Sequence, residues 1–394
     1  MNRFNRWIAR RAARDDAALV AELVAAGRTP ARPGWHLTRA FVVAAAVLVQ
    51  IVALGSLALG AWLCVRHFPS YTLLPGVALL AFGVVLLPRP PGLPRYATRL
   101  HRRDAPHLFA FVDRVAERVG VPAPGLIVVD DRFAADGATT GVLRRRYLRL
   151  GAPLLAVLDA DQRAAVVAHQ LAHFDSGDPL RGGPAAAVDE SLSALVLLFE
   201  PRPPATMRAT NDPQLLRASL ATGGFGKLGG VAADVWYAEV LLRPVLAVLQ
   251  WLSVLVRLAV VGAARSDVHR AEYRADAVAA EVAGSAAALE AVSLLAAREP
   301  VLTVLRRHVR AGGSDRPDPE AWRALARSVL EHGVAESAPD ASPFAGHPPP
   351  AYRMRLLRSL PDHPAPPRDD AGCAGVDAEL AGEFRRMARD LRYG

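Results

Sequence analysis

Two histidines, His169 and His173, stand four residues apart in the apolar stretch Ala164–Pro179 (AAVVAHQLAHFDSGDP). Side chains at this spacing share one face of an α-helix, so two imidazoles there can converge on one metal ion. In the H-E-x-x-H pattern that binds zinc in hydrolytic sites, the glutamate is the general base. Gln170 stands at that position here. The stretch therefore predicts a zinc site that lacks the side chain normally responsible for hydrolysis.

A catalytic zinc site takes three protein ligands and leaves one position to water, so a third ligand must come from elsewhere. The best candidate is Glu272, in the helical pattern HRAEYRAD, which ends at Asp276. These two acidic residues lie one turn apart and repel each other unless something cationic or polar absorbs their charge. We expect Glu272 to bind the metal and Asp276 to hydrogen-bond a ligand imidazole. Each pattern alone is more typical of ordinary helix residues, and their pairing favours a site.

The composition limits the class of protein. The chain has 394 residues, is 52% hydrophobic and carries a formal net charge of +9, nearly all from arginine because Lys227 is the only lysine. Such a charge suits an anionic membrane surface or a nucleic acid. No basic patch is interleaved with aromatic residues, so we favour the membrane and expect no nucleic-acid partner. GC-rich coding, which carries no function, is an alternative source of the arginine bias. Cys64, in an apolar run, and Cys373 do not indicate a disulfide framework.

Two apolar runs predict a transmembrane hairpin over residues 39–88. Phe41–Val65 exceeds the ~20 residues needed to cross a bilayer core, and Tyr71–Leu87 lies near the lower limit of ~17. The short connector Arg66–Ser70 joins them. The preceding basic arm, residues 1–38, is interpreted as a solvated tail.

The flanks of the hairpin predict its orientation. The N-terminus does not resemble a signal peptide, because about forty largely polar residues precede the first apolar run. Arginines gather before the first run and after the second, whereas the connector holds only Arg66. By the positive-inside rule, both flanks and the main domain lie in the cytoplasm, at the inner membrane of a bacterial cell.

Two later apolar segments, Ala186–Phe199 and Pro244–Ala263, leave the topology open. If His173 and Glu272 bind one metal, the chain between them crosses the membrane an even number of times. Either both segments span as a strained pair or neither does. We favour neither, because the first is short and the second carries Arg257 near its middle. Pro244–Ala263 is then expected to be a core or membrane-surface helix.

The main domain is expected to combine a small sheet with several helices. Gly125–Asp130 and Tyr147–Leu150 are predicted strands, with Thr139 and Thr140 in the turn between them and Asp130 facing solvent. Asp159 and Asp161 are candidate N-caps of the histidine helix. Further helices are predicted over Arg265–Ala297 and Ala378–Leu391, and a loop is predicted over Glu200–Gly230.

Four pieces of the chain, in this order, carry a resemblance to a known family. They are the membrane hairpin and three segments, LDADQRAAVVAHQLAHFDSGD (Leu158–Asp178), EYRADAVAA (Glu272–Ala280) and GHPPPAYRMRLL (Gly346–Leu357). Together they resemble the HtpX-like and CAAX-prenyl-endopeptidase-like membrane zinc metallopeptidases, the M48 peptidase family. The resemblance covers roughly residues 41–360. We expect a metallopeptidase-like domain over residues 95–360, with an insertion over 184–263 and a tail with a helix over 361–394.

The resemblance assigns roles to individual residues. It implies that His169, His173 and Glu272 are the zinc ligands and that Asp276 supports one of the ligand imidazoles. It also places His347 and Arg353 near the substrate cleft. The implied fold is a mainly α-helical α+β domain of the gluzincin type, whose small sheet holds an extended peptide along its edge. The implied reaction is peptide-bond hydrolysis on peptide or membrane-protein substrates at the membrane.

Gln170 departs from the family pattern and leaves the activity open. An amide cannot accept the proton that the family's glutamate takes from zinc-bound water, although it can still hydrogen-bond that water. Zinc lowers the pKa of its water toward ~7, so some hydrolysis could persist without the roughly 10²–10⁴-fold help of a general base. Three interpretations follow: a weak or conditional zinc metallopeptidase, a zinc-binding pseudoprotease that binds peptides or a partner, and a membrane structural protein without metal.

Overall fold

The chain forms two compact units in the residues that the structure describes. The computed structural model describes residues 3–31, 37–66, 73–88, 92–94, 96–141, 145–175, 184–199, 225–311, 317–332, 346–367 and 370–393. Most of the predicted connector Arg66–Ser70, residues 200–224 of the predicted loop, and Asp178 lie outside them. Unit 1 comprises Met1–Arg39, Arg89–Gly183 and Ala264–Gly394, and unit 2 comprises Ala40–Pro88 and Pro184–Ala263.

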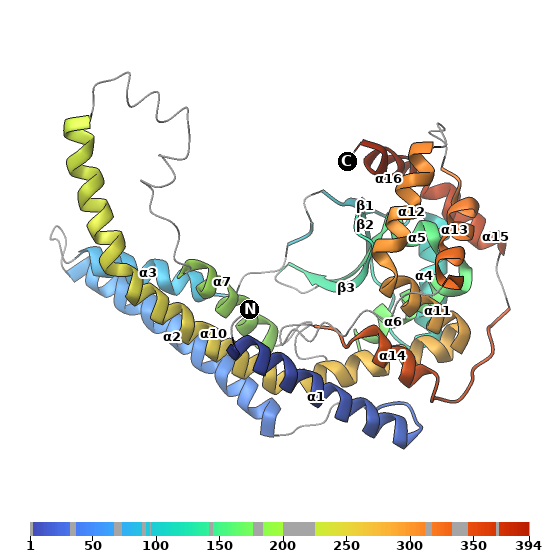
Figure 1. The fold of residues 1–394 in the computed structure, drawn as a ribbon, viewed down its shortest axis with the longest axis horizontal. Helices are drawn as coiled ribbons and strands as arrows, with labels where there is room; N and C mark the ends of the chain where they lie inside the picture. The colour runs from blue at the N-terminus through green and yellow to red at the C-terminus, as the bar shows by residue number, and fades with distance from the viewer. Residues whose placement is uncertain are drawn as a thin grey trace. The chain divides into compact units, whose positions relative to one another are not determined.

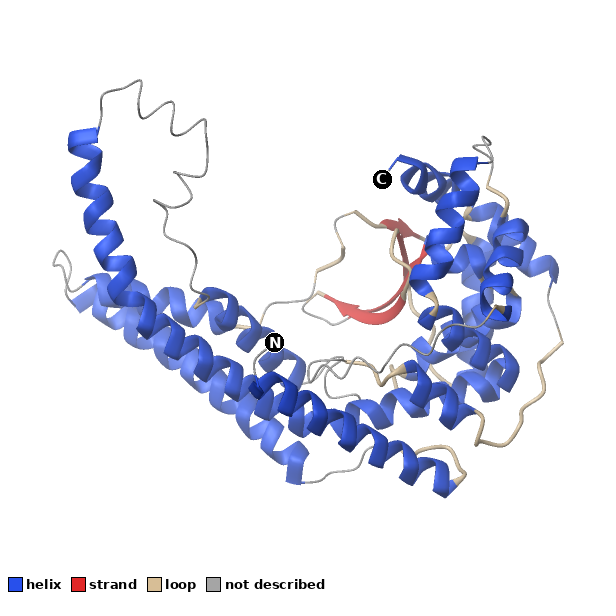
Figure 2. Ribbon diagram, in the orientation of Figure 1, coloured by secondary structure: helices blue, strands red, loops and turns tan. Residues whose placement is uncertain are grey.

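Unit 1 is mainly helical around one small sheet, which confirms the predicted α+β class (Figure 2). Its strands are β1 (Thr98–Leu100), β2 (Leu126–Asp130), β3 (Ala135–Thr140) and β4 (Arg145–Gly151). Its helices, labelled in Figure 1, are α1 (Arg3–Ala26), α4 (Pro106–Val119), α5 (Ala152–Val157), α6 (Ala160–Ala172), the last part of α10 (Phe225–Ala283), α11 (Ser285–Ala296), α12 (Arg298–Ala311), α13 (Pro319–Glu331), α14 (Pro350–Leu357), α15 (Asp370–Glu379) and α16 (Ala381–Tyr393).

The sheet has the strand order β1-β2-β4-β3, so β3 lies at one edge. Strands β2 and β4 are parallel and match the two predicted strands, while β1 and β3 join them antiparallel. Thr139 and Thr140 belong to β3, so their prediction as turn residues is wrong. The sequence of β3, ADGATT, lacks the branched apolar residues that signal a strand. Asp130 is buried and paired with Arg132 and Arg149, not exposed to solvent as predicted.

Helix α6 is the central helix of the core of unit 1. It begins with a capping box, in which the Asp159 carboxylate accepts from the Gln162 backbone N–H and the Gln162 side chain accepts from the Asp159 N–H. This confirms the predicted cap at Asp159 and leaves Asp161 inside the helix. Every residue of α6 from Asp161 to Ala172 is buried, because the helix packs against α4, α11 and the edge strand β3. Polar side chains on this helix are therefore held in fixed positions.

Helix α10 ends before the predicted long helix would. Gly284 has φ +96°, which a residue with a Cβ rarely adopts, and it separates α10 from α11. A Cβ at this position would also lie 2.9 Å from the backbone of Ala365. The prediction of one helix over Arg265–Ala297 is therefore wrong at this break, which turns the chain after α10 has presented Glu272 and Asp276.

The N-terminal arm is a packed helix and not the solvated tail that was predicted. The Asp16 carboxylate accepts two hydrogen bonds from Arg265 of α10, at 3.0 and 2.6 Å, and lies 3.0 Å from Nδ1 of His269. Burial raises the pKa of Asp16, but His269 and Arg265 outweigh this effect, so the pKa is lowered. The apolar side of α1, with Leu19, Val20 and Leu23, packs on Tyr273 and Leu356. Figure 1 shows α1 alongside the end of α10.

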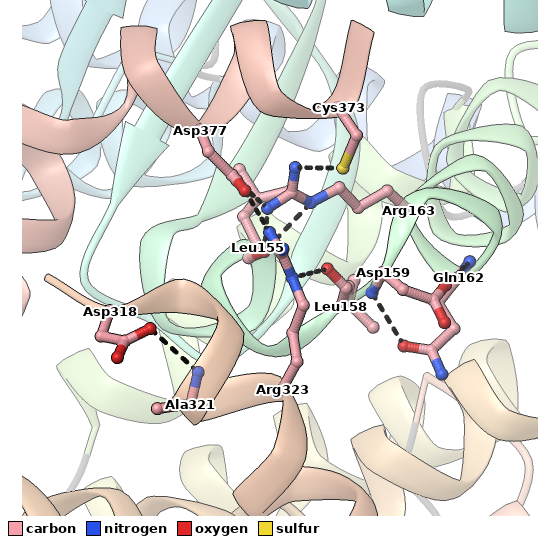
Figure 3. Close-up of polar contacts among 10 residues, drawn as sticks. All are labelled: Leu155, Leu158, Asp159, Gln162, Arg163, Asp318, Ala321, Arg323, Cys373 and Asp377. Carbon is pink, nitrogen blue, oxygen red and sulfur yellow. Dashed lines mark hydrogen bonds and ion pairs between the residues drawn. The ribbon is translucent and has the colours of Figure 1, made fainter. Parts of the chain in front are cut away.

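The C-terminal helices are part of the same core. Asp377 of α15 accepts from Arg163 of α6 and from Arg323 of α13, and the nearly fully buried Arg163 also donates to the Leu155 carbonyl at 2.7 Å (Figure 3). Buried apolar residues from this region join the core cluster, namely Val376, Leu380, Phe384, Met387 and Leu391. The segment predicted as a tail therefore packs onto the helix that carries the histidines.

Unit 2 contains α2 (Leu37–Arg66, from Ala40), α3 (Leu73–Leu86), α7 (Pro184–Leu198) and α10 up to Ala263. Among the described helices, Leu37–Arg66 and Leu246–Ala283 are long and apolar enough to cross a membrane, and α3 is a shorter apolar helix. Hydrogen bonds tie the elements of this unit together, among them one from the Ser191 hydroxyl to the Leu86 carbonyl at 2.8 Å and one from Arg257 to Asp189 at 2.7 Å.

Pro244–Ala263 was predicted to be a core or a membrane-surface helix, and the exposure of α10 contradicts the first of these alternatives. Val248 and Leu252 are 66% and 56% exposed, which no core helix would show. Large apolar side chains are also exposed on the other helices of unit 2, among them Ile51, Trp62, Val77 and Leu197. An apolar surface of this kind marks a membrane-associated unit.

The two carboxylates of α1 that pair with α10 provide a matched test of this packing. We predict that Asp16→Ala lowers the free energy of unfolding by about 3–5 kcal/mol, because it leaves Arg265 and His269 buried without their anion. Glu22→Ala removes the pair with Arg270, in which the Glu22 side chain is 62% exposed. That loss is expected to cost no more than about 1 kcal/mol. Thermal unfolding in detergent compares the two variants, and equal stability would contradict the packed arm.

Candidate metal centre

Three buried side chains from two helices meet at the centre of unit 1. His169 lies in the last turn of α6, His173 caps its C-terminus, and Glu272 lies in the last part of α10. Their exposed fractions are 6%, 5% and 0%. One ligand atom from each lies within 4.8 Å of the others, so the structure brings the three predicted ligands together.

The spacing of these atoms fits one tetrahedral ion. The two imidazole Nε2 atoms are 3.2 Å apart, and the Glu272 oxygens lie 3.4 Å from His169 Nε2 and 3.2 Å from His173 Nε2. Ligand atoms at ~2.0–2.1 Å from a tetrahedral zinc are separated by roughly 3.3–3.4 Å. Two imidazole nitrogens and one carboxylate are also the donor set of catalytic zinc sites. The donor types and their separations therefore both fit zinc.

Asp276 orients one of the two imidazoles. Its carboxylate lies 2.9 Å from Nδ1 of His169, on the side of the ring away from the Nε2 atom that faces the cluster. Burial lowers the pKa of His169, but Asp276 and the hydrogen bonds to Asp276 and Glu272 outweigh it, so the pKa is raised. The anions that favour a proton on this ring favour a metal cation in the same way.

Arg353 completes the support around Asp276. Its guanidinium donates to both carboxylate oxygens, at 2.8 and 2.6 Å, and is itself 8% exposed. Burial lowers the pKa of Arg353, but the Asp276 carboxylate outweighs it and raises the pKa above the usual arginine range. The structure thus places Arg353 against Asp276, and Asp276 in turn contacts His169.

His347 approaches the cluster from the outside. Its Nδ1 lies 2.9 Å from Oε2 of Glu272, while 55% of its side chain is exposed. It belongs to the His347–Pro349 segment that leads into α14, so the helix that holds Arg353 also fixes the place of His347. The imidazole lies between solvent and the Glu272 carboxylate, where it can contact a bound ligand.

Gln170 is buried and held by the edge strand. Its Oε1 accepts a 3.0 Å hydrogen bond from the backbone N–H of Gly137 in β3. Because a backbone N–H only donates, the oxygen must face Gly137, and the NH₂ group, on the other branch of the amide, points away from Gly137. A Cβ at Gly137 would lie 2.8 Å from the Gln170 carbonyl oxygen, so only glycine allows this approach.

A cleft of about 350 Å³ adjoins the cluster. Its polar lining residues are Asp136, His169, Gln170, Asp276, His347 and Arg353. Small apolar side chains of α6, α10 and α11 line the rest, namely Ala165, Val166, Ala279, Ala288, Ala291 and Val292. The cluster therefore adjoins a cleft that both polar and small apolar side chains line.

Sequence reasoning named seven residues of this centre and missed Gly137. The structure brings all seven to the cluster or its cleft, whereas Asp175, further along the histidine segment, is exposed. The available signal for Gly137 was a glycine inside a short polar stretch, which marks a close backbone approach once a strand is recognised there.

The fold and the centre define a class, a zinc-type metallopeptidase domain with H-Q-x-x-H in place of H-E-x-x-H. The family model described as Peptidase family M48 matches residues 102–360. The chain therefore belongs to peptidase family M48, whose members are metallopeptidases. No solved structure matches the chain significantly.

Several curated relatives share part of this region. The chain is 32% identical over 92 residues to a protein named Protease HtpX homolog from Trichormus variabilis, covering 23% of this chain and 32% of the relative. It is 33% identical over 104 residues to the homolog from Acaryochloris marina, covering 26% and 36%, and 29% identical over 92 residues to that from Thermococcus kodakarensis, covering 23% and 32%. The chain thus spans about a third of the length of these relatives.

The contact between β3 and α6 can be tested with two glycines. We predict that Gly137→Ala destabilises the protein by about 1–3 kcal/mol, because the new Cβ pushes the edge strand off the Gln170 backbone. Gly125, which precedes β2, has no atom within 4 Å of an added Cβ and serves as the control. Thermal unfolding of Gly125→Ala and Gly137→Ala measures the difference, and equal midpoints would contradict the close approach.

Proposed function

We propose that this chain is a membrane-anchored zinc metallopeptidase homologue in which peptide-bond hydrolysis is weak or lost. The observation that carries the proposal is the buried group of His169, His173 and Glu272, spaced as zinc ligands, next to Gln170. Membership of peptidase family M48 supports the reaction class. Metal binding is supported by the chemistry of the cluster, because a buried carboxylate between two imidazoles is stabilised by a cation.

Each residue has a proposed role. His169, His173 and Glu272 would hold zinc, which supplies Lewis-acid polarisation and a water of lowered pKa when it is bound. Asp276 orients His169 and is neutralised by Arg353. The exposed imidazole of His347 contacts the ligand, and the edge strand β3 aligns an extended peptide along the cleft.

Gln170 limits the ability of this site to hydrolyse a peptide bond. Its amide oxygen faces Gly137, so the group turned away from the strand is an N–H donor that cannot take a proton from water. This supports a second candidate function, a zinc-binding pseudoprotease that acts as a peptide- or partner-binding module at the membrane.

The proposed setting is the inner membrane of a bacterial cell, with unit 1 in the cytoplasm. The arginines that flank the predicted hairpin support this orientation. The exposed apolar side chains of α7 and α10 support a revised topology, in which these two segments enter the membrane together with the hairpin. The Arg257–Asp189 pair supports this topology, because it compensates the charge whose burial argued against a span.

Metal analysis tests the ligand assignment. We predict about one zinc per chain in the native protein and none in His169→Ala. Asp276→Asn is expected to weaken zinc binding by about 10–100-fold, because it removes the anion that orients His169. Competition with a chromophoric chelator measures both affinities. Native protein purified without stoichiometric zinc would contradict the proposal and leave a structural membrane protein.

Activity assays separate the two candidate functions. We predict that Gln170→Glu raises the cleavage of casein by roughly 10²–10⁴-fold, because a carboxylate at this position can accept the proton. The double variant His169→Ala, Gln170→Glu is the matched control and should be inactive. Activity that appears only in Gln170→Glu supports the pseudoprotease. Native activity that is abolished by His169→Ala supports the weak peptidase.

A further inference from the structure

Resting on the proposed membrane setting, we infer that the first half of α1 binds the phosphate headgroups of anionic lipids in the cytoplasmic leaflet. The side of the helix that binds them carries Trp7, Arg10, Arg11 and Arg14, and we call it the basic face of α1. The second half of α1 packs inside unit 1 and holds the basic face in place.

The two halves of α1 differ in burial. One side of the second half is buried, through Asp16, Leu19, Val20 and Leu23. In the first half, Trp7 is 56% exposed, the Arg11 side chain is 69% exposed, and Arg10 and Arg14 are also exposed. Tryptophan is enriched where a membrane meets water, because its ring is apolar and its N–H is polar. The first half of α1 thus presents a side chain suited to that boundary.

The spacing of these residues places them together on the helix. Trp7, Arg10 and Arg14 follow one another at intervals of three and four residues, so they lie along one side of α1. The guanidinium carbon of Arg11 lies 5.8 Å from the centroid of the Trp7 ring. An aromatic side chain set among arginines is the arrangement that interfacial helices present to anionic headgroups.

The charge of the first half is positive throughout. The stretch Arg3–Arg14 contains five arginines and no acidic residue. Two acidic residues follow it directly. Asp16 is buried against Arg265, and Asp15 lies 4.0 Å from Arg11 with 67% of its own side chain exposed. An exposed pair of this kind is weak, so Asp15 leaves the basic face positive and open to an anionic partner.

The packing of α1 on α10 sets where the basic face lies within unit 1. The two helices run in the same direction, because Asp16 pairs with Arg265 and, further along, Thr29 donates to Glu281. The basic face precedes Asp16 by about 3–14 Å along the helix axis, at a rise of 1.5 Å per residue. It therefore lies toward the end of unit 1 at which α10 enters after Ala263. Up to that residue, α10 belongs to the membrane-associated unit.

This position favours lipid over other anionic partners. Residues 27–36 connect α1 to α2, a helix long and apolar enough to cross a membrane. The helix α10, on which α1 packs, continues back into the same membrane-associated unit. Anionic headgroups are thus supplied where the chain leaves the membrane, whereas a nucleic acid must be recruited from solution. Lipid phosphates accept hydrogen bonds from guanidinium groups, and the negative potential of the cytoplasmic leaflet attracts them.

Limited trypsin digestion of the full-length chain in lipid nanodiscs tests the inference, because Arg10, Arg11 and Arg14 are themselves trypsin sites. One set of nanodiscs is pure phosphatidylcholine, and in the other about a third of the lipid is phosphatidylglycerol. Cleavage within α1 is expected to be about 10–100-fold slower with phosphatidylglycerol, because bound headgroups oppose the local opening that trypsin needs. In about 1 M salt, where the screening length is ~3 Å, this protection should disappear.

Three exposed arginines at the end of α12 provide the matched controls, namely Arg306, Arg307 and Arg310. Their cleavage should be equally fast in both kinds of nanodisc. In the double variant Arg10→Gln, Arg14→Gln, cleavage after Arg11 should respond to phosphatidylglycerol by no more than about 3-fold. The double variant Arg306→Gln, Arg310→Gln removes the same charge and should keep the full protection of α1.

The outcomes separate this inference from the proposed function. Equal cleavage of α1 in both nanodiscs would overturn the inference. Protection in pure phosphatidylcholine by a single-stranded oligonucleotide or by inorganic phosphate, as strong as that by phosphatidylglycerol, would overturn the assignment to lipid. Zinc content is measured on every sample. A zinc-loaded chain with unprotected α1 contradicts only this inference, a protected chain without zinc contradicts only the metal site, and a chain that does not enter nanodiscs contradicts the membrane setting and the inference together.

Discussion

The carboxylate of Asp276 is the interaction on which the geometry of unit 1 depends. It is 1% exposed, it orients His169 of α6, and it accepts both hydrogen bonds from Arg353 of α14. A buried carboxylate is costly unless its partners are in place, so three helices from distant parts of the chain are fixed relative to one another. His347 is positioned by the same constraint, because it belongs to the segment that leads into α14.

The last part of α10 carries two buried charge clusters at successive turns along one face of the helix. Glu272 and Asp276 face α6, while Arg265 and His269 bind Asp16 of α1. The neighbouring Tyr273 packs on α1. These polar residues of α10 are thus buried against partners from α1, α6 and α14, which explains why so polar a helix segment lies inside the domain. The N-terminal helix α1 therefore helps to hold the part of α10 that carries Glu272.

The residues of the metal centre could be predicted from local sequence patterns, whereas the contacts that support them could not. The spacing of His169 and His173 and the cap at Asp159 are properties of one helix, so they can be read from a few consecutive residues. Asp16 gave no such signal, because its meaning depends on a contact with Arg265 about 250 residues away. The edge strand β3 was missed because its polar sequence follows no alternation, and its place is set by pairing with β4.

Gln170 shows how the fold and the chemistry of this site are separable. Glutamine and glutamate have nearly the same shape, and either side chain can accept the Gly137 N–H that holds position 170 against the edge strand. The packing of α6 on β3, the buried support of Asp276 and the spacing of the three ligands therefore do not require the general base. Selection for the fold would keep these features in either case. What changes is the charge at position 170, and with it the ability of this side chain to accept a proton from water.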